Sequence, residues 1–243
     1  MYIVTGASAG IGRAICQQLA NRNHQVIACA RNAVALNELA EEYPDQIQAQ
    51  ALDLSREENV NLLASTVNDS QACSLVHCAG TRVDLEPYGA IDTKALSHHF
   101  QVHVATPIAL FQQLLAQGIR IPKIGFIDSY SATVPRVGWG GYSIVKSAAQ
   151  MAARCARAEL SDTQTIRIFP GAVQTGVVDA VLTSNTETAQ VFQALKDDGK
   201  IATPDKVANF VCKILNDLPD QTLKSVDAWD FNDPQHQALV NSP

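Results

Sequence analysis

The chain has 243 residues, of which 47% are hydrophobic, and a net charge of −6 at pH 7. This length is enough for one large α/β domain with a buried core, and the acidic balance argues against the basic face that binds nucleic acid. The N-terminus has no basic leader, and no apolar run reaches the ~18 residues of a membrane span, so we expect a cytoplasmic protein without membrane or nucleic-acid partners.

A glycine-rich turn joins the first predicted strand, residues 2–4, to the first predicted helix. Residues 5–12 read Thr-Gly-Ala-Ser-Ala-Gly-Ile-Gly. The glycines allow close approach of the backbone, and the free N–H groups at the start of the helix suit a pyrophosphate. Such turns also occur for structural reasons, but the position after the first strand favours a dinucleotide site. The expected contacts are Gly6, Ser8, Gly10, Ile11 and Gly12.

The second predicted strand, 25–30, ends at Arg31 and Asn32. NAD-binding proteins usually carry an acidic residue at this turn for the ribose hydroxyls, and this chain has none. An arginine can instead pair with a 2′-phosphate, although a solvated arginine would give the same pattern. We therefore expect NADP(H), with Arg31 and Asn32 beside it. A methyltransferase is disfavoured, since adenosyl cofactors also prefer an acid here.

Strands continue to alternate with helices through residues 48–52, 55–67 and 74–78, as in a parallel sheet. Asp53 follows a strand and either accepts a hydrogen bond from the adenine amine or caps a turn. A capping-box pattern opens the helix at Ser55. The residues expected near the cofactor here are Asp53, Leu54, Cys78, Ala79 and Gly80.

A long helical pattern covers residues 92–117 and contains three histidines, His98, His99 and His103. These invite a metal-binding hypothesis, but no H-E-x-x-H or similar partner pattern accompanies them. The six cysteines show no C-x-x-C spacing and are expected to be free thiols. We predict no metal site.

The residues that point to catalysis are Ser129, Tyr142 and Lys146. Tyr142 and Lys146 lie four residues apart and would share one face of a helix, while Ser129 follows a predicted strand, 124–128. An ammonium group beside a phenol stabilises the phenolate, so the tyrosine could protonate a carbonyl oxygen that the serine also binds. Tyr-x-x-x-Lys alone also fits a solvated surface pair. Tyr130 and Trp139 are either aromatic pocket walls or core residues.

The last third begins with a strand, 166–169, and a turn expected to line the nicotinamide site. The residues proposed in that turn are Pro170, Gly171, Val173 and Thr175. Residues 176–200 are polar and are expected to form a mobile substrate lid rather than a framework element. A helix at 203–215 and a final strand at 223–230 complete the prediction. No internal boundary is evident, so we expect a single domain, 1–243.

Together, the 5–12 turn, Asp53, Ala79-Gly80, Ser129, Tyr142, Lys146 and Pro170-Gly171 resemble the short-chain dehydrogenase/reductase family along the whole chain. The resemblance implies a Rossmann-type doubly wound α/β fold with a parallel sheet of about seven strands and the cofactor across its carboxyl edge. It also implies that Lys146 holds the nicotinamide ribose. A homodimer or homotetramer is expected, paired through helices 92–117 and 142–160.

A narrower resemblance is to the sepiapterin reductase and benzil reductase-like group, through residues 194–201 and 225–234. It implies that Asp227 anchors the substrate, although an aspartate near a chain end is often only solvated. The motifs and the resemblance together predict an NADP(H)-dependent carbonyl reductase that acts on a small ketone or diketone. Flat compounds such as 1,2-diketones, quinone-like compounds and pterin side-chain ketones all fit.

Two positions depart from the family pattern. Cys78 and His103 stand where the family commonly has asparagines, the second of which holds a relay water through its backbone carbonyl. A histidine can keep that carbonyl in place, so we expect neutral His103 to support the relay and to make the rate more pH-sensitive near ~6.5. The alternative function is a non-catalytic NADP(H)-binding protein that senses redox state or binds a partner.

Overall fold

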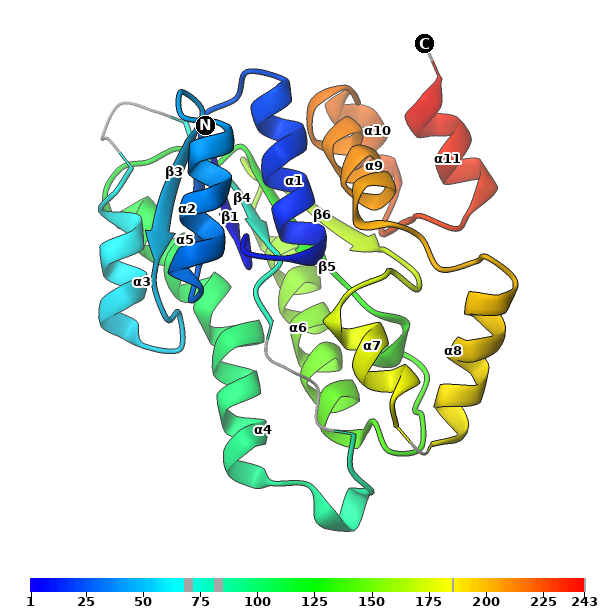
Figure 1. Cartoon of the computed structure of the whole chain (residues 1–243). Helices are drawn as coiled ribbons and strands as arrows, with labels where there is room; N and C mark the ends of the chain where they lie inside the picture. Colours follow the sequence, from blue (N-terminus) through cyan, green and yellow to red (C-terminus); the bar gives the residue numbers. More distant parts are fainter. Residues whose placement is uncertain (68–71, 81–84, 185, 243) are drawn as a thin grey trace.

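The computed structural model describes residues 1–67, 72–80, 85–184 and 186–242. Seven parallel strands form one sheet in the order β3-β2-β1-β4-β5-β6-β7 (Figure 1). After β3 the chain crosses to the other half of the sheet, so the switch point lies between the neighbouring strands β1 and β4, where doubly wound folds bind ligands. The expected Rossmann-type fold is confirmed. The strands are β1 (Tyr2–Thr5), β2 (Val26–Ala30), β3 (Ile47–Ala51), β4 (Ser74–His77), β5 (Lys123–Ile127), β6 (Gln164–Phe169) and β7 (Trp229–Asp230).

Helices cover both faces of the sheet, so the central strands are buried on both sides. One core unites α1 (Gly10–Asn21), α2 (Ala33–Glu42) and α9 (Pro204–Asn216) with the sheet, and a second core contains α3 (Glu57–Ala64) and α5 (Thr106–Ala116). In α9 the buried residues recur at helical spacing, which gives the helix one apolar face. None of the described helices is long and apolar enough to cross a membrane.

The expected helix at 92–117 contains a change of helix type. It consists of α4 (Thr93–Phe100), a π-helical turn η2 (Gln101–Ala105) and α5, and the buried His103 lies in the π turn. Pro107 has no N–H to donate to the His103 carbonyl four residues earlier, which disfavours a regular α-helix at this point. Such π turns are frequent near functional sites.

The long helix α6 (Gly140–Glu159) packs beside α4 and against β6. It thereby places its first turns at the carboxyl edge of the sheet. Two short 3₁₀ turns, η1 (Tyr88–Ala90) and η3 (Tyr130–Ala132), lie in the connections nearby.

Two local expectations were wrong, and a third stays a prediction. The segment expected as a substrate lid, residues 176–200, forms two helices, α7 (Gly176–Leu182) and α8 (Glu187–Asp197), and α7 buries two valines; residue 185 lies outside the described residues. The last predicted strand is α10 (Asp220–Ser225) followed by the short β7, before α11 (Pro234–Asn241). Helix α3 begins later than its capping box predicts, because the Ser55 hydroxyl donates to Asp53 instead.

Candidate active site

A cavity of about 1210 Å³ opens at the carboxyl ends of the central strands. Its walls come from the glycine turn after β1, the ends of β4, β5 and β6, the first turns of α6, and both α7 and α8. The structure therefore brings most of the predicted site residues together around one space. These are Gly6, Gly10, Ile11, Gly12, Arg31, Cys78, Ala79, Gly80, His103, Ser129, Tyr130, Trp139, Tyr142, Lys146, Pro170, Gly171, Val173 and Thr175.

Five predicted residues do not line this cavity: Ser8, Asn32, Asp53, Leu54 and Asp227. The Asn32 side chain caps α2 by accepting from the Ala35 amide at 3.2 Å. Asp53 accepts hydrogen bonds from Ser55, which lower the pKa of its carboxyl group, as its turn-capping alternative predicts. Leu54 is a core residue. Asp227 pairs with Arg167 at 3.0 Å, so its carboxylate is held away from the cavity.

The glycine turn is packed so tightly that Gly6 and Gly12 have no room for a side chain. A Cβ added to Gly6, where φ is +70°, would lie 2.7 Å from the backbone of Cys78, and one added to Gly12 would lie 2.3 Å from the Gly6 carbonyl oxygen. No side chain caps the start of α1, and its first residues line the cavity. The free N–H groups there can bind phosphate oxygens, so the turn fits a dinucleotide pyrophosphate.

A contact that the sequence reasoning missed fixes the end of β4 against β1. The Thr5 hydroxyl accepts from the Ala79 amide at 3.1 Å and lies 2.9 Å from Nδ1 of His77. Both contacts tie the end of β4 to β1, whichever imidazole nitrogen carries the proton. Thr5 was visible in the turn motif, but its pairing with β4 depends on strand order.

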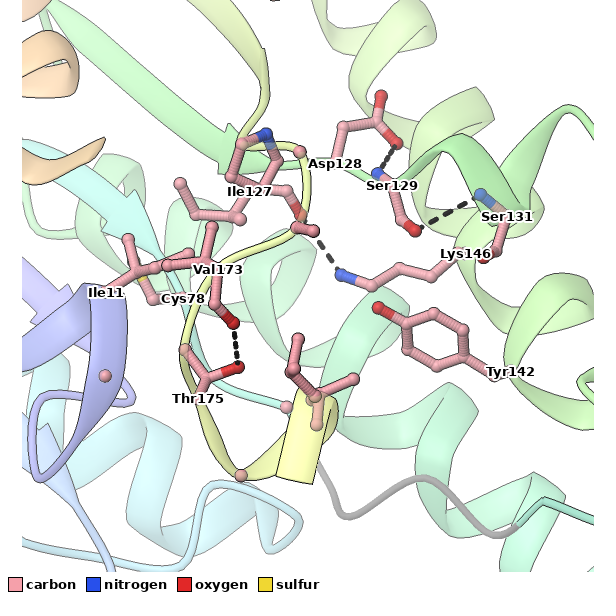
Figure 2. A pocket seen from close by; sticks show the side chains of 18 of the residues that line it. Ile11, Cys78, Ile127, Asp128, Ser129, Ser131, Tyr142, Lys146, Val173 and Thr175 are labelled. Carbon is pink, nitrogen blue, oxygen red and sulfur yellow. Dashed lines mark hydrogen bonds between the residues drawn. The ribbon is translucent and has the colours of Figure 1, made fainter. Parts of the chain in front are cut away.

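Ser129, Tyr142 and Lys146 face one region of the cavity (Figure 2). Lys146 Nζ donates to the Ile127 carbonyl at 3.1 Å and lies 5.8 Å from the centre of the Tyr142 ring. Ser129 Oγ accepts from the Ser131 amide at 3.2 Å, which leaves its own proton for another acceptor. Figure 2 shows the Tyr142 hydroxyl beside the Lys146 side chain.

Aromatic rings line the part of the cavity next to Tyr142. Trp139 meets Tyr142 edge-to-face at a centroid distance of 5.5 Å and stacks on Phe192 of α8 at 6.0 Å. Tyr130 stacks on Phe169 at 4.8 Å and its hydroxyl donates to Asp230. Phe192 was missed because residues 176–200 were interpreted as a lid, although Val191, Phe192 and Leu195 show helical spacing.

His103 also lines this cavity. It is buried beside the Gly80 backbone, and burial together with the nearby Lys146 charge lowers its pKa well below 6.5. The imidazole is therefore neutral near pH 6.5. The prediction that His103 makes the rate more pH-sensitive near pH 6.5 was wrong, because its lowered pKa keeps the imidazole neutral at that pH. Burial likewise lowers the pKa of His77 to about 3 and raises that of the Cys78 thiol to about 12.

The two buried histidines predict acid-sensitive stability. In the unfolded chain they bind protons below their ordinary pKa of ~6.5, whereas in the folded protein they stay neutral, so stability falls as pH drops below that value. For His77 alone the loss at pH 5 is about 2 kcal/mol. Denaturant unfolding at pH 7.5 and 5.0 should show a smaller loss for His103→Asn than for wild type. An equal loss of stability in His103→Asn and wild type would contradict this assignment. So would a similarly small loss in the exposed control His98→Asn.

Comparisons with known proteins agree with this geometry. The family model described as short chain dehydrogenase matches residues 1–190. A benzil reductase ((S)-benzoin forming) of Bacillus cereus is 28% identical over 88% of this chain and 92% of that protein, and a sepiapterin reductase of Xenopus laevis is 26% identical over 96% and 95%. The crystal structure of a short-chain dehydrogenase/reductase from Saccharomyces cerevisiae is 22% identical, covers 98% of both chains and has a TM-score of 0.86.

Proposed function

Since the chain belongs to the short-chain dehydrogenase family of oxidoreductases, which use a nicotinamide cofactor, we propose that it catalyses the NADP(H)-dependent reduction of a ketone or diketone to an alcohol. The membership confirms the resemblance inferred from its motifs. The observation that carries the proposal is the convergence of Ser129, Tyr142 and Lys146 in the cavity that the glycine turn borders (Figure 2).

The bound nicotinamide supplies the hydride, and the side chains of this chain handle the carbonyl oxygen. Tyr142 donates its phenolic proton to that oxygen, while the Ser129 hydroxyl donates a second hydrogen bond to it. The Lys146 ammonium stabilises the phenolate that remains. General acid catalysis of this kind contributes about 10²–10⁴ in rate.

The cofactor would be held by groups along the same edge of the sheet. The glycine turn would hold the pyrophosphate and Arg31 the 2′-phosphate, and the turn from Pro170 to Thr175 would border the nicotinamide; the three glycines of the first turn, Arg31 and all of the second turn except Gln174 line the cavity. Lys146 would also bind the nicotinamide ribose. The backbone of His103 would hold a water that connects Lys146 with solvent.

Arg31 gives a direct test of cofactor preference. Its side chain is exposed at the cavity, and none of the hydrogen bonds or ion pairs between described residues engages its guanidinium. An ion-paired hydrogen bond contributes about 1.5–3 kcal/mol, so Arg31→Ala should weaken NADPH about tenfold to a hundredfold and leave NADH nearly unchanged. The test compares the Kd values of wild type and Arg31→Ala for NADPH and for NADH, with the exposed Arg56→Ala as the control. An unchanged NADPH Kd would remove Arg31 from the cofactor site.

The aromatic walls favour a flat carbonyl substrate. Phe192 and Tyr130 give the substrate side of the cavity aromatic surfaces, with Trp139, only 3% exposed, packed behind Phe192, and α7 and α8 close this side as the proposed lid. The names of the two curated relatives suggest benzil and sepiapterin as first compounds. Following NADPH oxidation with each of them, and with a simple aldehyde, tests the proposal. No turnover with any carbonyl, despite tight NADPH binding, would reject it.

A non-catalytic NADP(H)-binding protein is the second candidate. It is favoured by Cys78 and His103, which replace two asparagines common in the family. It predicts tight NADPH binding without turnover, and it leaves the three converging catalytic side chains without a role.

We also propose a homodimer. Phe100, Ile108 and Leu115 of the helix spanning 93–116, and Ile144 and Met151 of α6, are 45–54% exposed. A second copy of the chain packed on this face would remove these apolar side chains from water. Light scattering should give about twice the 26.1 kDa mass of the chain, and a mass of one chain at micromolar concentration would contradict the dimer.

A further inference from the structure

A buried carboxylate lies directly behind Ser129. The Asp128 and Arg167 side chains are only 3% and 4% exposed, and they pair at 3.0 Å. The two carboxylate oxygens have different partners. Oδ1 accepts from the Ser129 amide at 2.8 Å, while Oδ2 accepts from Arg167 and from Gln150 Nε2, the latter at 3.1 Å (Figure 2 shows the Ser129 bond).

These bonds connect three elements. Gln150 lies on α6 four residues after Lys146, which itself lies four residues after Tyr142, so all three share one helix face. Lys146 donates to the Ile127 carbonyl, and Gln150 donates to the next residue, Asp128. The end of β5 is thereby tied to the helix that carries the proposed acid. Arg167, from β6, donates to the same carboxylate oxygen as Gln150, through Nε and Nη2.

We propose that Asp128 is a positioning residue: its carboxylate, held by Arg167 and Gln150, fixes the Ser129 backbone so that the serine hydroxyl keeps its place opposite Tyr142. The inference rests on the proposed function, in which Ser129 binds the carbonyl oxygen. Asp128 is not a catalytic residue in this account. Displacing a catalytic group by about 1 Å can lower the rate a hundredfold, so fixing the Ser129 hydroxyl gives the buried ion pair a role in catalysis.

The informative variant is Asp128→Asn. An amide has the same shape as a carboxylate but only one oxygen. The charged Arg167 attracts that oxygen, so the NH₂ group of the asparagine faces the Ser129 amide. An NH₂ group cannot accept a hydrogen bond, and the bond to the Ser129 amide is lost. If Asp128 acts through Ser129, Asp128→Asn lowers kcat at least tenfold with little change in KM for the carbonyl. In a Ser129→Ala background the same change alters kcat less than twofold, because there is no hydroxyl left to position.

Equal losses in both backgrounds would overturn the proposal, since they would reflect a general effect on the fold. Asp217→Asn is the control: Asp217 is also a carboxylate paired with an arginine, Arg22, at 2.8 Å, but its side chain is 48% exposed and neither residue lines the cavity. It should leave kcat unchanged. If Asp128→Asn does not fold, the Asp128→Asn/Arg167→Gln pair, which leaves no lone buried charge, replaces it in the cycle.

A second readout does not depend on activity. Amide hydrogen exchange at Ser129 in the ligand-free protein should be at least tenfold faster in Asp128→Asn and unchanged in Asp217→Asn. Unchanged exchange in Asp128→Asn would also overturn the proposal. If wild type reduces no carbonyl, the proposed function fails, and the exchange result alone decides whether Asp128 positions Ser129.

Discussion

Tyr142→Phe is expected to lower kcat for carbonyl reduction by about 10²–10⁴-fold, because it removes the proton that the proposed mechanism gives to the substrate oxygen. The ring remains, so its edge-to-face contact with Trp139 and its packing against the Lys146 side chain should persist. NADPH binding and the unfolding midpoint should therefore change little. Stopped-flow measurement of NADPH oxidation at saturating substrate gives kcat directly.

Tyr88→Phe is the matched control for this change. It removes the same hydroxyl from a tyrosine that is 81% exposed and does not line the cavity. Wild-type kcat in this control, with the loss confined to Tyr142→Phe, supports the assigned proton donor. Retention of full activity in Tyr142→Phe would mean that another group protonates the substrate.

Gly12→Ala is expected to disrupt both cofactor binding and stability. The added Cβ would lie 2.3 Å from the Gly6 carbonyl oxygen and 2.8 Å from its carbon, and both are backbone atoms of the same turn. The turn must open to accept it, at a cost of about 1–3 kcal/mol. The unfolding midpoint should fall by several degrees, and the Kd for NADPH should rise at least tenfold because the phosphate-binding N–H groups move.

Gly89→Ala provides the corresponding control, since a Cβ there meets no atom within 4 Å. Its unfolding midpoint and NADPH Kd should match those of wild type. Wild-type NADPH affinity in Gly12→Ala would show that the glycine turn does not hold the cofactor.

The sequence was sufficient for the fold and for the residues that cluster in short motifs. Alternating apolar strands and amphipathic helices predicted the parallel sheet, and the carboxyl edge of that sheet then placed the glycine turn, Ser129 and the Tyr142–Lys146 face around one cavity. These inferences depend on local periodicity and on the rule that parallel strands end at the same edge.

Contacts between distant segments were beyond the sequence. The ion pairs of Arg167 with Asp128 and Asp227 depend on the register of β6 between β5 and β7, which no local pattern encodes. For the same reason the sequence did not reveal that Asp227 pairs with Arg167 and lies outside the cavity lining. The last strand was overestimated because apolar residues at 223, 226 and 229 fit a helix end as well as a strand. The sequence suggested a neutral His103, but the burial that lowers its pKa well below 6.5 is a property of the fold.

The most direct test of the account follows the hydrogen that reduces the substrate. The enzyme would be incubated with benzil and NADPH carrying deuterium at both nicotinamide C4 positions, and the product analysed by mass spectrometry and NMR. The account predicts benzoin with one deuterium on the carbinol carbon, no such product with Tyr142→Phe on the same timescale, and normal NADPH binding in both proteins. Unreacted benzil and intact NADPH, bound but not oxidised by wild type, would contradict a carbonyl reductase that accepts this diketone, and benzoin lacking deuterium would contradict hydride transfer from the nicotinamide.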